Sequence, residues 1–165
     1  TTLFRSVNHP EDIIPMCLEA GADIISFHPE TANNKIFRLL NQIKDAGKKC
    51  GVVLNPATPA ESIAEYAHLL DKVTVMSVDP GYAGQKFIPE SLNKIRKLIN
   101  MRKNNGYHYL TEIDGSCNEK TFGQIAESGV DVFIVGTSGL FSLHEDVSQA
   151  WDRMIEIFQR ETVAA

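Results

Sequence analysis

The sequence predicts an α/β fold whose parallel strands are buried on both faces, and three observations lead to this prediction. Short apolar runs of strand length alternate with segments of helical periodicity from residue 10 to residue 158. Successive strands recur at about 30 residues, the spacing of one βα unit. No linker or low-complexity segment interrupts the alternation, so we expect residues 7–165 to belong to a single domain.

The first four elements have clear local signals. Residues 10–20 are expected to be helical because a proline and two acidic residues open the segment and Gly21 follows it. Residues 23–27 form a short apolar run and predict a strand. Isoleucine and leucine recur at helical spacing over residues 33–46, and residues 49–54 form an apolar strand that an Asn-Pro pair ends.

The middle of the chain repeats the same alternation. Residues 59–70 are predicted to be a helix with one apolar face, and the β-branched run 72–78 a strand. Residues 89–103 predict a helix that starts at a proline. Residues 109–114 predict the next strand, which ends in acidic residues and a glycine.

The last three elements complete the pattern. Residues 118–127 predict a helix that precedes a Gly, and residues 131–135 form an apolar strand. Residues 147–158 predict a closing amphipathic helix. Its inward face is expected to carry Trp151, Met154, Ile155 and Phe158.

Five βα units suit either an open doubly wound sheet or part of an eight-unit barrel. A complete barrel needs about 250 residues, or about 200 at the low end, and this chain has 165. If the fold is a barrel, about three leading strands are therefore missing. Residues 1–6 fit none of the expected elements and match what one frame of a common sequencing adapter encodes. We therefore expect residues 1–6 to be non-native sequence.

Composition excludes several classes of protein. The formal net charge is −5 and no run of lysine or arginine occurs, so we expect no nucleic-acid partner. The apolar runs are strand-length, far below the roughly 20 residues of a membrane span, so we expect no membrane partner. Three widely separated cysteines predict neither a disulfide framework nor a zinc ribbon, and they favour a reducing cytoplasmic location.

Ligands of parallel α/β folds bind at the carboxyl ends of the strands, so the residues after each strand are the candidate site. Two glycine-rich loops stand out there. One contains Gly81, Tyr82, Ala83 and Gly84, and the other contains Gly136, Thr137 and Ser138. Glycines let the backbone approach a ligand and present N–H groups to a phosphate. The alternatives are a plain connecting loop in the first case and a helix cap in the second.

A third strand end carries two carboxylates. Glu112 and Asp114 are two residues apart and share one face of the strand, and Gly115 and Ser116 follow. Buried carboxylates require a partner, so these residues predict an ion pair, metal binding or acid–base chemistry, with a turn residue as the alternative for Asp114. Met76 lies on the preceding strand, where its side chain is expected either to pack in the barrel core or to line the pocket.

His28 lies at another strand end, where a hydrogen-bonding structural histidine is favoured over a ligand.

Several segments resemble the ribulose-phosphate 3-epimerase family. Residues 75–87, with the sequence VMSVDPGYAGQKF, are similar to the signature of that family's sixth strand. The seventh and eighth strands are matched by EIDGS at 112–116 and VGTSGLF at 135–141. The fourth and fifth are matched by HPET at 28–31 and LNPATP at 54–59, and the resemblance extends over residues 7–158.

The resemblance implies strands 4–8 of a (βα)8 barrel that binds one divalent metal ion: zinc, cobalt, manganese, magnesium or iron. It implies inversion at C3 of a ketose phosphate, in which two carboxylates move the proton through a cis-enediolate. Asp114 matches one carboxylate and a metal ligand. The residues that match substrate and phosphate loops are Gly81, Tyr82, Ala83, Gly84, Gly115, Ser116, Gly136, Thr137 and Ser138, and Met76 matches an apolar residue near the reacting carbon.

Within the family, the sequences DGSCN and GTSGLF resemble the branch that acts on D-allulose 6-phosphate, with D-ribulose 5-phosphate as the alternative substrate. The second carboxylate and the histidine ligands of the family would precede Val7. We therefore expect this chain alone to be inactive and the intact protein to be a homo-oligomeric epimerase.

Two other functions stay open. One is a non-catalytic sugar-phosphate-binding chain. The other is a decarboxylase-like phosphate-binding barrel, which has thin support because Lys49 and Lys72 lie at strand starts.

Overall fold

The fold is a six-stranded parallel sheet with its helices along one side, and a computed structural model describes residues 2–4, 7–81 and 84–163. The sheet order is β1-β2-β3-β4-β5-β6 and every neighbouring pair is parallel. Its strands are β1 (Thr2–Phe4), β2 (Ile24–Phe27), β3 (Lys49–Leu54), β4 (Lys72–Met76), β5 (Leu110–Asp114) and β6 (Val132–Ile134).

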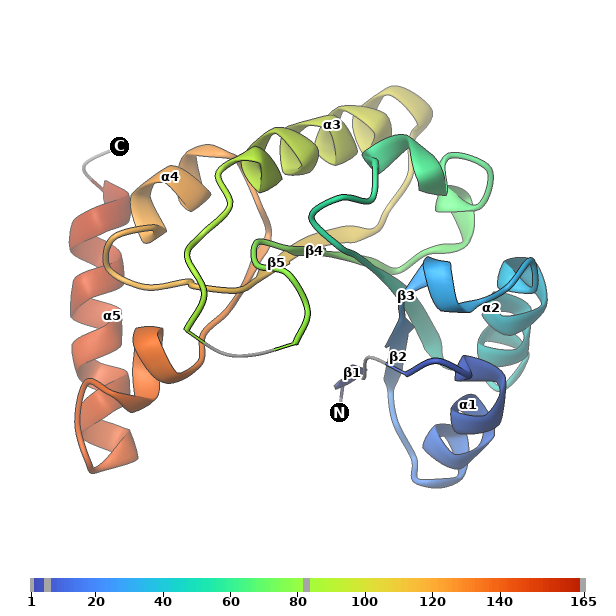
Figure 1. The fold of residues 1–165 in the computed structure, drawn as a ribbon, viewed down its shortest axis with the longest axis horizontal. Helices are drawn as coiled ribbons and strands as arrows, with labels where there is room; N and C mark the ends of the chain where they lie inside the picture. The colour runs from blue at the N-terminus through green and yellow to red at the C-terminus, as the bar shows by residue number, and fades with distance from the viewer. Residues whose placement is uncertain (1, 5–6, 82–83, 164–165) are drawn as a thin grey trace.

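The helices form an arc outside the sheet, from α1 and α2 at one end through α3 to α4 and α5 at the other (Figure 1). They are α1 (Pro10–Glu19), α2 (Ile36–Asp45), α3 (Glu90–Asn105), α4 (Phe122–Glu127) and α5 (Val147–Val163). Strands that pair in chain order and alternate with outer helices are typical of a βα barrel. The predicted partial barrel is therefore confirmed, with β2–β6 as its five expected strands.

Four short helices complete the described chain. Three are 3₁₀ helices, η1 (Pro29–Thr31), η2 (Ala60–Ile63) and η3 (Ala67–Leu69), and η4 (Thr137–Phe141) is a π-helical turn after β6. No helix in the described parts of the chain is both long and apolar enough to cross a membrane.

Residues 2–4 differ from expectation because they form an element. β1 pairs with β2 in parallel, with Thr2 opposite Ile24 and Phe4 opposite Ser26. The edge of β2 presents unpaired backbone groups, and a short β-branched and apolar segment satisfies them. That residues 1–6 are non-native sequence stays a prediction.

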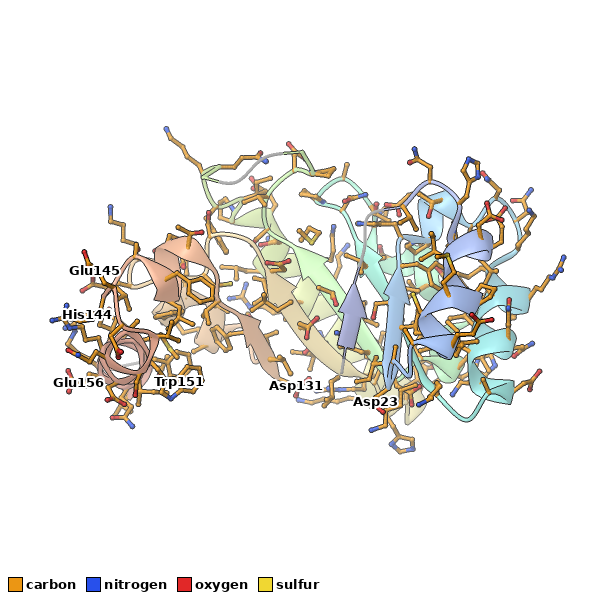
Figure 2. All side chains as sticks on the ribbon, turned by 90° about the horizontal axis from the view of Figure 1, so that it is seen from below. Asp23, Asp131, His144, Glu145, Trp151 and Glu156 are labelled. Atoms are coloured by element: carbon orange, nitrogen blue, oxygen red, sulfur yellow. The ribbon has the colours of Figure 1, made fainter. Side chains whose placement is uncertain are left out.

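Two further expectations were wrong in detail. Residues 59–70 do not form one α-helix but the two 3₁₀ helices η2 and η3, because the backbone of Tyr66, with φ −125° and ψ 8°, leaves the helical region between them. Trp151 does not face inward, and its side chain is 51% exposed on α5 (Figure 2). The helix instead buries Ala150 and Met154, and Phe158 packs on Phe122 at a ring distance of 5.3 Å.

A buried polar group lies inside the arc of strands. Lys72 Nζ lies 2.8 Å from Glu112 Oε1, and the two side chains are only 6% and 9% exposed. Thr74 Oγ1 donates to the same carboxylate oxygen at 2.7 Å. The pairing requirement predicted for Glu112 is thus met by β4.

At the amino ends of the strands, aspartate side chains accept hydrogen bonds from a neighbouring strand. Asp131 precedes β6, and its Oδ2 accepts hydrogen bonds from the backbone N–H and the hydroxyl of Thr111, both at 2.7 Å. Arg102 Nη1 donates to the same oxygen at 2.6 Å. Asp71 repeats this arrangement before β4 by accepting from the backbone N–H of Cys50 at 2.8 Å. Asp23 and Asp131 mark these amino ends at the tails of the strand arrows in Figure 2.

Asp131 should stabilise the fold in a pH-dependent way. Burial alone raises the pKa of its carboxyl, but hydrogen bonds from Arg102 and Thr111 outweigh this, so the pKa lies below its usual 3.8. Such a carboxylate contributes stability above its unfolded pKa, and that stability is lost as the pH falls through the folded pKa.

We expect Asp131→Asn to lower the free energy of unfolding by roughly 1–2 kcal/mol at pH 7 and by much less at pH 3, as urea denaturation would measure. Glu61→Gln is the matched control, since Glu61 and its partner Lys97 are more than half exposed and the change should be undetectable. An equal loss at both pH values would contradict the assignment.

Candidate active site

A large cleft opens at the carboxyl ends of the strands. Its volume is about 1030 Å³ and it is lined by residues that follow β2, β3, β4, β5 and β6. This is the edge of the sheet at which parallel α/β folds bind ligands. The loop between β4 and α3, green in Figure 1, lies on the concave side of the arc.

Asp114 is the last residue of β5 and lies at the floor of this cleft. The ladder places it beside Met76 of β4 and Ile134 of β6, and both of these side chains also line the cleft. Burial raises the pKa of the Asp114 carboxyl, and the charge of Glu112 raises it further. A carboxyl group with a raised pKa between two apolar neighbours is suited to accept and return a proton.

The loops after β4 and β5 are joined by backbone hydrogen bonds. The N–H of Ser77 donates to the carbonyl of Asp114 at 2.8 Å, and its hydroxyl lies 2.5 Å from the carbonyl oxygen of Gly115. Gly115 has φ +119°, and a Cβ there would lie 2.8 Å from the Ser77 hydroxyl and from Val78. Only glycine fits this close approach.

Side chains and backbone extend this connection to the loop after β6. Ser116 Oγ donates to the carbonyl of Gln85 at 2.6 Å, so the loops after β5 and β4 are held together. Asn118 Nδ2 donates to Ser138 Oγ at 3.2 Å. A Cβ on Gly139 would lie 2.1 Å from the carbonyl oxygen of Cys117, so these two backbones are in contact.

The other wall of the cleft comes from the loops after β2 and β3. Glu30 Oε1 accepts hydrogen bonds from Asn55 Nδ2 at 3.2 Å and from the hydroxyl of Thr58. Lys94 reaches in from α3, and its Nζ donates to the carbonyl of Asn55 at 2.5 Å. His28 is buried at the end of β2, and burial lowers the pKa of its imidazole.

The structure brings most of the sequence-predicted site residues to this one cleft. Those that line it are Met76, Gly81, Gly84, Asp114, Gly115, Ser116, Gly136, Thr137 and Ser138. Tyr82 and Ala83 lie outside the described residues. Their roles in binding or catalysis stay predictions, because position alone does not test them.

Sequence reasoning missed several residues that shape the cleft. Asn55 and Gln85 line it, and Ser77 and Asn118 hold its loops. For Asn55 the signal was present, since an Asn-Pro pair directly follows a strand. Asn118 and Ser138 are 20 residues apart, and no local pattern relates them.

The described residues of this chain do not by themselves fit a divalent metal ion. They contain no group of three or more histidine, cysteine, aspartate or glutamate side chains that could hold one. The possible ligand side chains that line the cleft are His28, Asp79, Asp114 and Cys117, and no three of them come together, whereas protein-bound divalent ions take four or more ligands.

Fold and cleft together define a βα-barrel-type protein with its ligand site at the carboxyl ends of the strands. Solved structures agree on the fold. A 3-hexulose-6-phosphate synthase matches with a TM-score of 0.63 at 14% identity, covering 92% of this chain and 68% of that one. A tryptophan synthase α-subunit from Pyrococcus furiosus matches with a TM-score of 0.61 at 14% identity, covering 93% and 60%.

The chain belongs to the ribulose-phosphate 3-epimerase family, whose model matches residues 4–141. The ribulose-phosphate 3-epimerase of Buchnera aphidicola subsp. Schizaphis graminum is 41% identical over 131 residues, which cover 79% of this chain and 57% of the relative. That of Aquifex aeolicus is 41% identical over 143 residues, covering 87% and 64%. The chain thus spans about three fifths of the length of these relatives.

The contact between Gly139 and Cys117 predicts that position 139 tolerates no side chain. We expect Gly139→Ala to lower the free energy of unfolding by about 1–3 kcal/mol, because its Cβ would overlap a backbone oxygen. Gly136→Ala is the matched control, since nothing lies within 4 Å of its added Cβ. Thermal and urea unfolding would measure both, and equal stability of the two variants would contradict the packing described.

Proposed function

We propose that this chain forms the substrate cleft of an epimerase that inverts C3 of a ketose phosphate. The observation that carries the proposal is the place of Asp114, on the cleft floor beside three joined loops. Membership of the ribulose-phosphate 3-epimerase family supports the same reaction.

The three loops are proposed to hold the phosphate group. Gly81, Gly84, Gly115 and Gly136 expose backbone at the cleft, and Ser138 adds a hydroxyl. Backbone N–H groups in glycine-rich turns form concave sites for anions. The residues Tyr82, Ala83, Ser116 and Thr137 complete the proposed set.

Asp114 is proposed to exchange the proton at C3 from one face of the sugar. A phosphate fixed at the rim would place the sugar carbons along the cleft floor, over the Asp114 carboxyl. Met76 and Ile134 flank it on the neighbouring strands, and these apolar neighbours would favour proton transfer to carbon over transfer to solvent. Inversion needs a second proton-transferring group on the opposite face of the sugar.

The substrate is proposed to be D-allulose 6-phosphate, which would be converted to D-fructose 6-phosphate. This choice rests on the sequences DGSCN and GTSGLF, which begin at the ends of β5 and β6. Both sequences resemble the branch of the family that acts on D-allulose 6-phosphate. The alternative, D-ribulose 5-phosphate, is favoured by the names of the curated relatives. Comparing kcat/KM on the two sugars would separate these substrates.

A second candidate is a non-catalytic sugar-phosphate-binding chain. It is favoured by the carboxylates that line the cleft, since only Asp114 is partly buried at a strand end, whereas Asp79 is exposed in the loop after β4. Under this hypothesis the 165-residue chain binds phosphate and shows no turnover, and we propose that the chain is inactive when isolated.

The test is isotope exchange at C3 by the protein expressed from its source gene. Asp114→Asn should lower the rate of ²H incorporation from D2O by roughly 10²–10⁴-fold, because general acid–base groups contribute about that factor. Asp152→Asn, on the exposed surface of α5, is the control and should leave the rate unchanged. Normal exchange in the Asp114 variant would exclude its proposed role, whereas phosphate binding without exchange in the wild type would favour the second candidate.

A further inference from the structure

Asn118 does not line the cleft but contacts a residue that does. Ser138 borders both the cleft and a smaller pocket of about 240 Å³, and Asn118 lines only the smaller pocket. Asn118 therefore acts on a ligand in the cleft only through another residue. Its contact with Ser138 joins the loop after β5 to the π-helical turn after β6.

The orientation of the Asn118 amide is fixed by two backbone groups. Its Oδ1 accepts from the N–H of Lys120 at 3.1 Å, and its Nδ2 donates to the carbonyl of Ser116 at 3.1 Å. A backbone N–H only donates and a carbonyl only accepts, so exchanging the two amide atoms would break both hydrogen bonds.

This orientation determines the direction of the contact with Ser138. The second hydrogen of Asn118 Nδ2 points to Ser138 Oγ at 3.2 Å, so the serine oxygen is the acceptor. Its own proton must then be donated elsewhere. Within the residues that the structure describes, no acceptor is assigned to that proton, and Ser138 is exposed at the cleft.

We propose that Asn118 is a positioning residue that holds the Ser138 hydroxyl as a donor toward an anionic phosphate oxygen. The inference rests on the proposed phosphate site. Phosphate oxygens are strong acceptors and have no proton to donate when fully ionised. A hydroxyl whose oxygen already accepts a hydrogen bond can still donate its own proton. It therefore suits a phosphate oxygen, which accepts, better than a ligand group that donates.

The variant Asn118→Asp tests the direction of this hydrogen bond. It changes one group of the side chain and keeps the oxygen that accepts from Lys120. The Ser138 hydroxyl would then donate to the new carboxylate and be lost to the ligand. We expect the Kd for inorganic phosphate to rise roughly tenfold or more, since a hydrogen bond to a charged group is lost.

A double-mutant cycle with Ser138→Ala separates this effect from the added charge. In the Ser138→Ala background the Asn118→Asp change should raise the Kd by less than about threefold, because only the added charge and the lost hydrogen bond to the Ser116 carbonyl then remain, and both are common to the two backgrounds. Asn118→Ser is the matched neutral control. It keeps an acceptor for Lys120 but is too short to reach Ser138, and should weaken binding by a few-fold.

The measurements use the protein expressed from its source gene, with inorganic phosphate as the calorimetric titrant and thermal unfolding as the test of folding. With a ketose phosphate substrate, KM should rise in Asn118→Asp while kcat changes less than twofold. An unchanged Kd, or an equal rise with and without the Ser138 hydroxyl, would overturn the proposal. A wild type that binds no phosphate would instead overturn the phosphate site itself.

Discussion

The register between β4 and β5 is the constraint on which the rest of the site depends. The strand register places Met76 opposite Asp114. The buried ion pair of Lys72 and Glu112 lies in the same two strands, nearer to their amino ends. A slip of one residue would turn Asp114 out of the cleft and separate this ion pair. Removing one partner of a buried pair leaves a costly charge, so the pair acts against such slips.

Close backbone contacts fix the positions of the loops relative to the strands that precede them. Ser77 joins the loop after β4 to Asp114 and Gly115, and Gly139 brings the turn after β6 against Cys117. The small residues in these loops therefore have two roles. They leave room for neighbouring backbones to meet, and they expose backbone groups at the cleft, where we propose that the phosphate binds.

Much of this arrangement follows from local sequence. Apolar runs between helical segments predicted five of the six strands, and the spacing of Glu112 and Asp114 placed both inside the sheet. Tertiary packing decided the rest. Trp151 has the periodicity of a core residue, yet α5 packs on α4 and η4 through other positions.

Contacts between distant loops were the least predictable part of the site. Lys94 lies on α3 and binds the carbonyl of Asn55, which is 39 residues away. Asn118 and Ser138 meet only because β5 and β6 are neighbours in the sheet. The sequence shows which residues are present but not which of them pair across such a network.

We propose that the loops after β4, β5 and β6 together hold the phosphate of a ketose phosphate above Asp114. A crystal structure of the protein expressed from its source gene, soaked with D-allulose 6-phosphate, would test this arrangement. We expect phosphate density between Gly84, Gly115 and Ser138, with the sugar directed toward Asp114. Phosphate bound outside these loops, or a sugar directed away from β5, would contradict it.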